Sequence, residues 1–462
     1  MDLRAAAVVL AAGDGKRMRS ARSKVCCEVL SKPMLSWVLD ACARFGLPNE
    51  RVCAVLSGRD DGVRELLPAG VAQAVQAERL GTGHAVRCAE NFLRAMQAAG
   101  VETVCVLCGD APLLDETALA QSLEAHRAGG HGVTVLTACP EDPARYGRIV
   151  RGEGGVRIVE AADASPEELA IREINAGLYW FSLPYLLEAL PLLQNGNAQG
   201  EYYLTDLVGM APALGRTAGA ARCANADCAL GANDRRELAA LNEIARRRVF
   251  DALYAAGVDI PCTDGVLIGP DVTVGADTRI LPGCILTGRT AIGAGCVIGP
   301  DTQVIDSAIG DGTSADHARI ERSTVGKDCR IGPYTQLRPG CDVADGVKIG
   351  NFVEVKNSTV GARTSFAHLT YIGDSDFGSG INVGCGVVTV NYDGQNKYRT
   401  VVGDGAFIGC NTNLIAPVTV GEGAYIAAAT TVTEDVSPEA LVFGRARQQE
   451  KPGGAKGRIK KR

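Results

Sequence analysis

The amino-acid sequence predicts an α/β chain with two architectures: a doubly wound domain, one connecting helix, and a left-handed parallel β-helix of six-residue repeats. The first observation is an alternation of strand-like and helix-like segments over residues 1–210. The second is an aliphatic repeat of period six that begins at Ile268. The third is the glycine content, because 24 of the 56 glycines precede residue 251 and 32 follow it.

Residues 1–210 alternate between buried strands and amphipathic helices. The helix predicted over residues 33–44 begins with Pro33 and is followed by Gly46, the order that helix ends prefer. Helices are also predicted over residues 83–98 and 115–126. The strands are predicted over residues 5–10, 52–56, 71–76, 104–108, 133–138 and 176–181. This alternation is typical of a mostly parallel sheet, which binds its ligands at the carboxyl ends of its strands.

A long helix is predicted over residues 233–256, between the two architectures. Gly257 follows its last turn. Apolar side chains recur three or four residues apart among Arg and Glu, at Leu238, Leu241, Ala245, Val249 and Ala252.

Aliphatic side chains recur every sixth residue in three blocks of the second part. Each hexapeptide is expected to form one short strand whose aliphatic side chain points into a triangular prism, with glycine or another small residue at the corner. Three hexapeptides complete one coil, so stacked coils bury a continuous aliphatic column. The repeat positions are Ile268, Val274, Ile280, Leu286, Ile292, Ile298 and Val304, then Val325, Ile331, Leu337, Val343, Ile349 and Val355, then Val402, Ile408, Leu414, Val420, Ile426 and Val432.

Two stretches depart from this period. The register slips over residues 305–324, where no polar cluster occurs and no function is assigned. The spacing is lost again over residues 357–387, and residues 388–401 form a polar excursion. Because repeat proteins carry insertions on their binding face, this excursion is expected to mark a site.

Composition excludes two classes of protein. The net charge is −6 and aromatic residues make up 5% of the chain, whereas a general nucleic-acid binder needs a basic surface and stacking rings. No run of eighteen apolar residues occurs, so no membrane span is expected.

The seventeen cysteines are interpreted as reduced thiols of a cytoplasmic protein. Their number is odd and the chain is long, unlike a small disulfide-rich scaffold. Cys105 and Cys108 have the spacing of metal ligands, but no second pair follows at zinc-finger distance, so no metal is expected there. Arg4 and the apolar run after it resemble a signal peptide, but a strand that enters a glycine loop explains them better.

A glycine-rich loop, L-A-A-G-D-G-K-R-M, runs from Leu10 to Met18 after the first predicted strand. Gly13 and Gly15 let backbone N–H groups approach phosphates, and Lys16 and Arg17 add positive charge. The loop has neither the G-x-G-x-x-G spacing nor the G-K-[ST] ending, so a simple tight turn explains it equally well when it is taken alone.

Further polar motifs follow in order along the first part. The segment from Gln76 to Ala85, Q-A-E-R-L-G-T-G-H-A, opens a helix with a second glycine loop. C-G-D places Asp110 just beyond an apolar strand, where a metal-binding carboxylate is expected. The remaining motifs are D-P-A-R-Y-G-R-I at 142–149, I-V-E at 158–160, E-I-N-A-G at 173–177 and N-A-Q-G-E-Y-Y-L-T-D at 197–206.

Taken together, these motifs resemble the sugar-phosphate nucleotidyltransferases. With the hexapeptide half, the chain resembles the bifunctional N-acetylglucosamine-1-phosphate uridylyltransferase/glucosamine-1-phosphate N-acetyltransferases from Val8 to Arg445. The resemblance implies a Rossmann-like uridylyltransferase domain over 1–230, a linker helix over 231–257, a β-helix acetyltransferase domain over 258–446 and a basic flexible tail over 447–462. It also implies a cytoplasmic homotrimer that makes UDP-N-acetylglucosamine for synthesis of the cell envelope.

The resemblance also assigns roles in the first domain. Arg17 and Lys24 would neutralise UTP, while Asp110 and Asn233 would hold Mg²⁺. The sugar 1-phosphate would attack the α-phosphorus of UTP in line, and pyrophosphate would leave. The nucleotide and phosphate contacts would be Leu10, Ala11, Ala12, Gly13, Gln76, Gly81, Thr82, Cys108 and Gly109, and the sugar contacts would be Gly147, Glu160, Asn175, Glu201 and Tyr202.

Candidate residues in the second part lie on neighbouring coils. Arg338 and Lys356 are eighteen residues apart, so they should stack on one side of the prism and suit a phosphate. His368 is one of five histidines, and an imidazole has the near-neutral pKa that deprotonation of an amine needs. The resemblance makes His368 the base that lets glucosamine-1-phosphate attack the thioester of acetyl-CoA. The sugar phosphate contacts would be Arg338, Lys356, Tyr371, Asn382, Asn391 and Tyr392, and the acetyl-CoA contacts would be Cys385, Cys410, Ala428 and Arg445.

The sequence departs from the family pattern at several positions. Ser23 precedes Lys24 in place of the usual Pro, and Cys26 and Cys27 replace an apolar residue and a His. Cys108 stands where an aromatic is common, and Phe366 stands where the family often has Lys. Cys385 and Cys410 stand where Ala and Ser are typical. Of these departures only Phe366 removes a charge, and the resemblance connects that position with the acetyl donor.

Two alternative functions remain open. One is a nucleotidyltransferase for another sugar 1-phosphate, whose β-helix only assembles or regulates. The other is a regulatory or scaffold relative, which predicts loss of Lys24, Asp110 or Asn233, although all three are present. Residues 453–462 carry five cations, which suggests contact with the anionic nucleotide of CoA.

Overall fold

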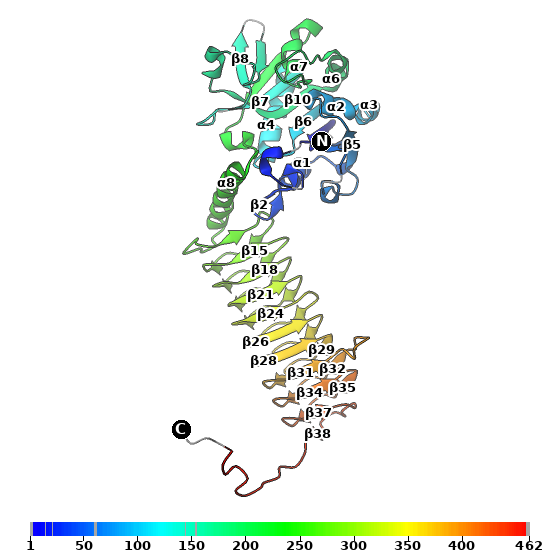
Figure 1. The fold of residues 1–462 in the computed structure, drawn as a ribbon, viewed down its shortest axis with the longest axis vertical. Helices are drawn as coiled ribbons and strands as arrows, with labels where there is room; N and C mark the ends of the chain where they lie inside the picture. The colour runs from blue at the N-terminus through cyan, green and yellow to red at the C-terminus, as the bar shows by residue number, and fades with distance from the viewer. Residues whose placement is uncertain are drawn as a thin grey trace. The chain divides into compact units, whose positions relative to one another are not determined.

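The structure is a computed structural model that describes residues 3–13, 15–20, 22–59, 62–143, 145–152 and 155–458. It divides into two compact units, Met1–Arg248 and Val249–Arg462. In Figure 1 the first unit runs from blue to green and the stacked coils of the second unit run from green to red. Within the described residues, no helix has the length and apolar character to cross a membrane.

The first unit is built on a sheet with the order β11-β7-β10-β6-β1-β4-β5. β1 pairs in parallel with β4 and β6, and β10 runs antiparallel to its neighbours β6 and β7. The carboxyl ends of β1, β6 and β5 therefore meet along one edge. The strands are β1 Ala5–Leu10, β4 Val52–Ser57, β5 Ala72–Gln76, β6 Thr103–Cys108, β7 Val133–Ala138, β10 Ile174–Ser182 and β11 Ala218–Arg222, with the hairpins β2 Glu28–Val29 with β3 Lys32–Pro33 and β8 Arg148–Gly152 with β9 Gly155–Val159.

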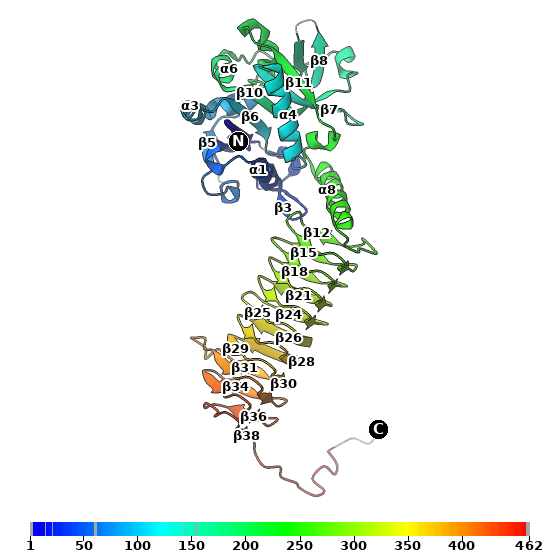
Figure 2. The same cartoon turned by 180° about the vertical axis from the view of Figure 1, so that it is seen from behind.

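Helices cover both faces of this sheet. Alternate residues of β1 point to opposite faces, so Ala7 packs in one apolar cluster with α1 and α4, and Val8 packs in another with α2, α3 and α6. Figure 2 shows α4 in front of β7 and β11. The helices are α1 Met34–Arg44, α2 Thr82–Cys88, α3 Glu90–Ala98, α4 Glu116–Gly129, α5 Pro166–Leu169, α6 Leu183–Ala189, α7 Asp206–Met210 and α8 Arg235–Ala255.

The second unit is a parallel β-helix with three faces. β26 and β28 are long strands that run through the corner between the first and second faces. The first face contains β12 Leu267–Ile268, β15 Ile285–Thr287, β18 Gln303–Ile305, β21 Ala318–Glu321, β24 Thr335–Leu337, β26 Lys348–Lys356, β28 Ser365–Gly373, β31 Val388–Val390, β34 Asn413–Ile415 and β37 Thr431–Val432. The second face adds β14 Arg279–Ile280, β17 Val297–Ile298, β20 Ser314–Ala315, β23 Arg330–Ile331, β30 Asn382–Val383, β33 Phe407–Ile408, β36 Tyr425–Ile426 and β38 Leu441–Val442. The third face contains β13 Thr273–Val274, β16 Ala291–Ile292, β19 Ala308–Ile309, β22 Thr324–Val325, β25 Asp342–Val343, β27 Thr359–Val360, β29 Ser375–Phe377, β32 Thr400–Val402 and β35 Val418–Val420.

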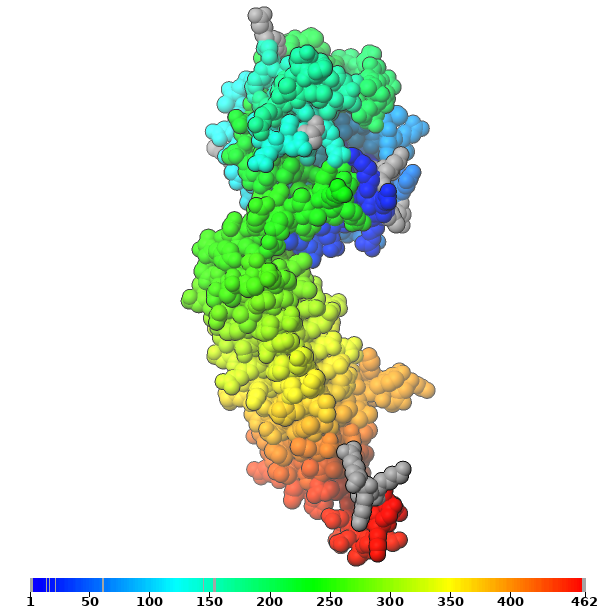
Figure 3. Space-filling view, turned by 60° about the vertical axis from the view of Figure 1, so that its left-hand side comes forward, coloured from blue at the N-terminus to red at the C-terminus, as the bar shows by residue number. Residues whose placement is uncertain are grey.

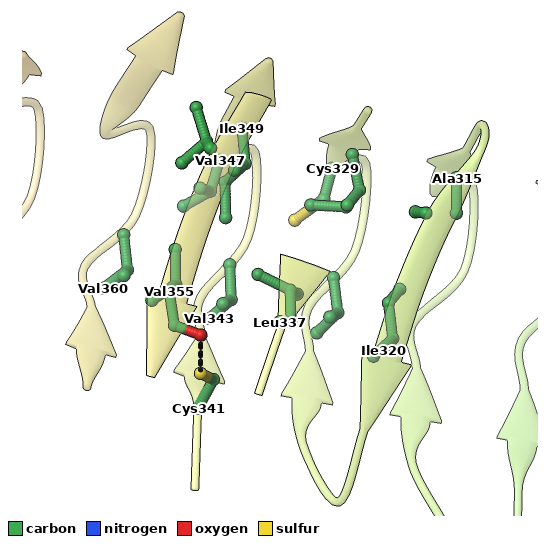
Figure 4. Close-up of a cluster of buried hydrophobic side chains, with 14 of the residues drawn as sticks. Ala315, Ile320, Cys329, Leu337, Cys341, Val343, Val347, Ile349, Val355 and Val360 are labelled. Carbon is green, nitrogen blue, oxygen red and sulfur yellow. Dashed lines mark hydrogen bonds between the residues drawn. The ribbon is translucent and has the colours of Figure 1, made fainter. Parts of the chain in front are cut away.

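One aliphatic column fills the prism, as the six-residue repeat predicts. Figure 4 shows Ile320, Leu337 and Val355 stacked inside it, one from each of three successive coils. The thiol of Cys341 lies at the edge of this column and donates to the carbonyl of Val355 at 3.3 Å. Burial raises the pKa of this thiol, so it behaves as a small apolar side chain.

The structure corrects two details of the predicted pattern. The helix predicted over residues 83–98 is two helices, because Ala89 interrupts it with φ −89° and ψ 8°. The slips in the hexapeptide register do not interrupt the β-helix. Ile320 pairs with Val304, which is sixteen residues earlier, and Phe366 pairs with Ile349, which is seventeen earlier, so coils of slightly different length stack without a break.

Candidate active sites

Two adjoining cavities lie at the carboxyl edge of the sheet in the first unit. The larger has a volume of about 680 Å³ and the smaller about 230 Å³. Both are lined by Leu10, Thr82, Cys108, Asp110 and Asn233. These five residues form the boundary between the two cavities. A molecule bound in one cavity can therefore contact a molecule bound in the other.

Lys24 lies on the wall of the larger cavity, between the side-chain oxygens of Asp110 and Asn233. Its ammonium contacts the carboxylate of Asp110 and donates to Oδ1 of Asn233 at 3.1 Å. Burial lowers the pKa of Lys24, but the charge of Asp110, the hydrogen bond to it and the nearby Cys108 and Glu237 together outweigh burial, so the pKa is raised overall. Three groups that the sequence analysis assigned from segments far apart therefore converge at one point.

This convergence supports the fit of Mg²⁺. A carboxylate and an amide oxygen are the hard ligands that the ion prefers, and a cationic group already occupies the space between them. Across the described part of the chain, no group of three His, Cys, Asp or Glu side chains could hold a metal by itself. An ion at Asp110 and Asn233 would therefore take its remaining ligands from phosphates and water.

Glycines allow the loops to pack closely around the larger cavity. Gly81 has φ +101°, and a Cβ there would lie 2.6 Å from the carbonyl oxygen of Tyr202. Gly15 has φ +56°, and a Cβ there would lie 2.6 Å from Cβ of Lys24. Both positions need a residue without a side chain.

The smaller cavity is lined by groups suited to sugar hydroxyls. Oε1 of Glu160 accepts a hydrogen bond from Thr205 at 3.0 Å. The pKa of Glu160 is raised, first by burial and then by nearby carboxylates. Nδ2 of Asn175 donates to the hydroxyl of Tyr179 at 2.5 Å, and both residues line the cavity.

Most of the first-domain residues that the sequence analysis assigned line one of the two cavities. In addition to the five shared residues, the larger is lined by Ala12, Gly13, Arg17, Lys24, Gln76, Gly81 and Glu201, and the smaller by Gly147, Glu160 and Asn175. Asp14 and the side chain of Lys16, both in the predicted glycine loop, lie outside the described residues.

Three predicted residues line neither cavity. The amide of Ala11 donates to Val55 at 2.9 Å, and the amide of Gly109 donates to Leu10 at 2.9 Å, so both bonds hold neighbouring strands together. The carbonyl of Tyr202 accepts from Gly83 at 2.8 Å, which ties two loops together.

The structure also adds lining residues that sequence reasoning missed. Arg79 lines the larger cavity, and Tyr146 and Arg145 line the smaller. Arg145 and Tyr146 belong to a motif that was recognised, but only Gly147 of that motif was assigned. Burial raises the pKa of Tyr146, whose hydroxyl accepts a hydrogen bond from Gly231 at 3.4 Å.

The candidate base of the second unit lies on β28 at the corner between the first and second faces. His368 is directly opposite Asn351 of the preceding coil. Nδ1 of His368 lies 2.5 Å from Oδ1 of Asn351, so the amide oxygen selects the tautomer with the proton on Nδ1. Nε2 then carries the lone pair that a general base needs.

Arg338 and Lys356 lie on adjacent coils of the first face, as their spacing predicts. The amide of Arg338 donates to the carbonyl of Val355 at 2.8 Å. Its guanidinium donates to Glu354 at 2.9 Å. The pKa of Lys356 is lowered, first by Lys397 and then by burial, so two cations face one another here.

The polar excursion lies beside these cations, because its Lys397 faces Lys356. Residues 391–399 extend between β31 and β32 and project from the side of the column (Figure 3, orange). Asn391 donates to Asp374, which also accepts from Asn357 at 2.5 Å. The hydroxyl of Tyr392 donates to Gly394 at 2.6 Å. Sequence reasoning missed Lys397, although it lies within the excursion.

The predicted acetyl-CoA residues follow one another along the same corner as His368. The amide of Asn411 donates to Cys385 at 2.7 Å, and the amide of Ala429 donates to Cys410 at 2.8 Å. The guanidinium of Arg445 donates to the carbonyl of Ala428. We call this line the corner column, and it consists of His368, Cys385, Cys410, Ala428 and Arg445, one residue from each successive coil.

Asn382 lies apart from the predicted cation cluster. It is on the second face, in register with Ser365 and Phe407, whereas Lys356 and Tyr371 are on the first face. One chain therefore does not bring all the predicted sugar phosphate residues together.

Comparisons with known proteins assign both units. Residues 6–221 match the nucleotidyl transferase family, residues 268–367 match the GMPPB C-terminal domain, and residues 399–434 match the bacterial transferase hexapeptide family. A bifunctional protein GlmU from Halalkalibacterium halodurans is 44% identical over 447 residues, which are 96% of this chain and 97% of that protein. Bifunctional GlmU proteins of Fervidobacterium nodosum and Geobacillus thermodenitrificans are each 45% identical, over 97% and 96% of this chain and 96% of each relative. The chain therefore belongs to the bifunctional GlmU family, with a nucleotidyltransferase domain followed by a hexapeptide acyltransferase domain.

Proposed function

We propose that the second unit transfers the acetyl group of acetyl-CoA to glucosamine-1-phosphate, and that the first unit transfers UMP from UTP to the resulting N-acetylglucosamine-1-phosphate. The products are UDP-N-acetylglucosamine and pyrophosphate. The observation that carries the uridylyl transfer is the pair of cavities that share Asp110 and Asn233. We place the reactions in the cytoplasm, because a reducing compartment fits the free cysteines of the chain.

In the uridylyl transfer, UTP would fill the larger cavity and the sugar phosphate the smaller. The phosphate oxygen of the sugar attacks the α-phosphorus, and the bond to pyrophosphate breaks. Lys24 and Arg17 bind the phosphates. Asp110 and Asn233 would hold Mg²⁺, which when bound neutralises phosphate charge. Glu160 and Asn175 orient the sugar.

In the acetyl transfer, Nε2 of His368 takes the proton from the sugar amine. The amine nitrogen then attacks the thioester carbonyl, the C–S bond breaks, and CoA leaves as a thiolate that regains a proton. Arg338 and Lys356 bind the phosphate of the sugar, with Tyr371 beside them on the first face. The acetyl donor would lie along the corner column.

We propose that three copies of the chain assemble through the β-helix. A ladder, which we define as His317, Tyr334, Phe352 and Leu369, runs along the corner next to His368, with His317 half-buried and the other three exposed. The rings of Tyr334 and Phe352 stack 5.5 Å apart, and their exposed fractions are 56% and 57%. Large apolar side chains are rarely left exposed in line, so a partner surface is expected to cover them.

The separation of the catalytic groups supports a site shared between subunits. Lys356 is opposite Gly373, which is five residues beyond His368 on β28. The strand turns the corner between these positions, where Leu369 has φ +43°, so His368 lies at the corner while Lys356 lies on the first face. We infer that one subunit supplies the base together with Asn382, and that a neighbour supplies the cations of its first face.

The acetyl transfer is tested by release of free thiol from acetyl-CoA with glucosamine-1-phosphate, using the wild type and His368→Ala. We expect the variant to lose at least about 100-fold in rate. Pyrophosphate release from UTP and N-acetylglucosamine-1-phosphate should stay unchanged and shows that the variant is folded. Equal thiol release by both proteins would remove His368 as the base, and no release by the wild type would favour a β-helix without catalytic function.

The shared site is tested by subunit complementation. His368→Ala and Lys356→Met should each be inactive in acetyl transfer alone. Random mixing of the two in refolded trimers should restore about a quarter of the sites, because each site needs an intact base from one chain and intact cations from its neighbour. If both groups come from one chain, mixing restores nothing.

A further inference from the structure

The corner column contains the most accessible thiol of the molecule. All seventeen cysteines lie in the described ranges, and Cys410 alone among them is exposed. Cys385, on the preceding coil, is partly exposed. Both follow His368 along the corner, so any chemistry of these thiols takes place beside the candidate acetyl-donor site.

The register of the coils places these two cysteines opposite one another. Val383 pairs with Ile408 and Val388 pairs with Asn413, so a constant offset of 25 residues sets Cys385 against Cys410. The amide that follows Cys410 donates to the carbonyl of Cys385 at 2.7 Å. Sγ of Cys410 lies 2.9 Å from the place of a Cβ on Gly384, so this side chain leans onto the coil of Cys385.

Cys385 and Cys410 lie in corner turns whose flanking strands are paired, so the spacing of the strands sets the distance between the two turns. Adjacent strands are about 4.8 Å apart, and disulfides form at Cα separations of about 4.4–6.8 Å. The Cβ atoms of in-register residues are also about 4.8 Å apart, slightly beyond the preferred value of about 3.8 Å. A bond here is therefore accessible and readily reduced.

We propose that Cys385 and Cys410 are a modification site that a hydroperoxide converts to a reversible disulfide, which closes the corner column to the acetyl donor. The formation of the bond stands on the geometry of the coils alone. Its effect on the donor rests on the proposed acetyltransferase function.

The reaction balances with a hydroperoxide as oxidant. The thiolate of Cys410 attacks one peroxide oxygen, the O–O bond breaks, and a sulfenic acid and one molecule of water (or alcohol) form. The thiol of Cys385 then attacks the sulfur of Cys410, the S–O bond breaks, and a second water leaves as the disulfide forms. An external dithiol restores both thiols by exchange and becomes a disulfide itself.

The sequence allows the bond to be detected directly in the full-length protein. Trypsin cleaves after Arg363, Lys397, Arg399 and Arg445, so residues 364–397 contain only Cys385 and residues 400–445 contain only Cys410. After hydrogen peroxide and alkylation, we expect these two peptides to be joined and two hydrogen atoms lighter than their sum. Separate peptides, with Cys410 alkylated or carrying a sulfinic acid, overturn the proposal, as does a bond between two copies of the chain on a non-reducing gel.

The effect on activity is measured on the same samples. We expect peroxide to lower acetyl transfer at least about 10-fold, to leave pyrophosphate release unchanged, and to be reversed by dithiothreitol. In Cys385→Ala and in Cys410→Ser, the acetyl transfer rate after peroxide should be about equal to the rate before it, because neither variant can form the disulfide. Cys223→Ser, which alters a different thiol that hydrogen-bonds with Cys228, should stay as sensitive as the wild type. If the peptides are joined but acetyl transfer is unchanged, the disulfide forms without closing the corner column to the donor, and that part of the proposal is overturned. If the peptides are joined and the reduced chain shows no acetyl transfer at all, the proposed function is overturned instead.

Discussion

Nδ1 of His368 lies 2.5 Å from Oδ1 of Asn351, directly across two paired coils. An amide oxygen can only accept a hydrogen bond, so it holds the imidazole in one tautomer and one orientation. The position of a base on a rigid strand is thereby set by a residue that need not touch the substrate.

Replacement of Asn351 should impair acetyl transfer without removing the base. We expect Asn351→Ala to lower kcat about 10-fold, because the ring loses its fixed tautomer. Asn351→Asp should retain more activity but shift the acid limb of the kcat/KM profile to higher pH, since a carboxylate stabilises the imidazolium. A loss of rate in both variants with no change in the pH profile would indicate a purely structural role. Pyrophosphate release is the control for folding.

Lys397 should contribute to binding of the sugar phosphate. It faces Lys356 and lowers the pKa of that residue, so a bound phosphate relieves the repulsion between them. We expect Lys397→Met to raise KM for glucosamine-1-phosphate about 10-fold while kcat changes little. Lys348→Met removes an exposed lysine from the second face, away from the cation cluster, and serves as the matched control. An equal change in both variants would contradict the local role.

Removal of the Lys24 ammonium should reduce uridylyl transfer. Lys24→Met loses the group that contacts Asp110 and Asn233, and leaves the half-buried carboxylate of Asp110 without this cation. We expect kcat/KM for UTP to fall about 100-fold or more, with acetyl transfer unchanged. Lys32→Met alters another lysine of the same unit, one that pairs with Asp40, and should retain uridylyl transfer. A similar loss in both variants would argue against a specific role for Lys24.

Gly81→Ala should disturb the loop that lines the larger cavity. The new Cβ would lie 2.6 Å from the backbone oxygen of Tyr202 and would also meet a φ of +101°. We expect KM for UTP to rise about 10-fold or more and Tm to fall. Gly100 has φ +81° with open space around it, so Gly100→Ala isolates the backbone strain, about 1 kcal/mol, from the clash. If the two variants behave alike, contact with Tyr202 is not what requires glycine.

The raised pKa of Glu160 predicts that the stability of the folded chain falls with rising pH. Burial, followed by nearby carboxylates, raises its pKa in the folded chain, so folding favours the protonated form. The folded state therefore loses stability as the pH rises from the usual carboxyl range through the raised pKa. Glu160→Gln should have a higher Tm than the wild type at pH 7, a difference that disappears near pH 4, and a raised KM for the sugar phosphate. Glu167 is exposed with a lowered pKa, so Glu167→Gln should show no such gain.

The features predicted from the sequence are those that local pattern controls. The period of six predicted the column that contains Leu337 and Val355, and the end of an apolar strand predicted the place of Asp110. The break of the helix at Ala89 was missed because the apolar pattern continues through it. Asn351 and Lys397 were missed for another reason, since their importance comes from neighbours on other coils. Ala11, Gly109 and Tyr202 were assigned to ligands, but their backbone groups bond to the protein itself.

The coils of the second unit repeat by translation, and each touches only the coil before it and the coil after it. A structure of this kind has no natural length. Duplication or loss of one whole turn far from His368, for example around Ile280, would give the two flanking coils new neighbours of the same kind and leave the coils around His368 unchanged. The β-helix can therefore be lengthened or shortened in evolution by the gain or loss of whole coils, while His368 and the residues around it keep their spacing.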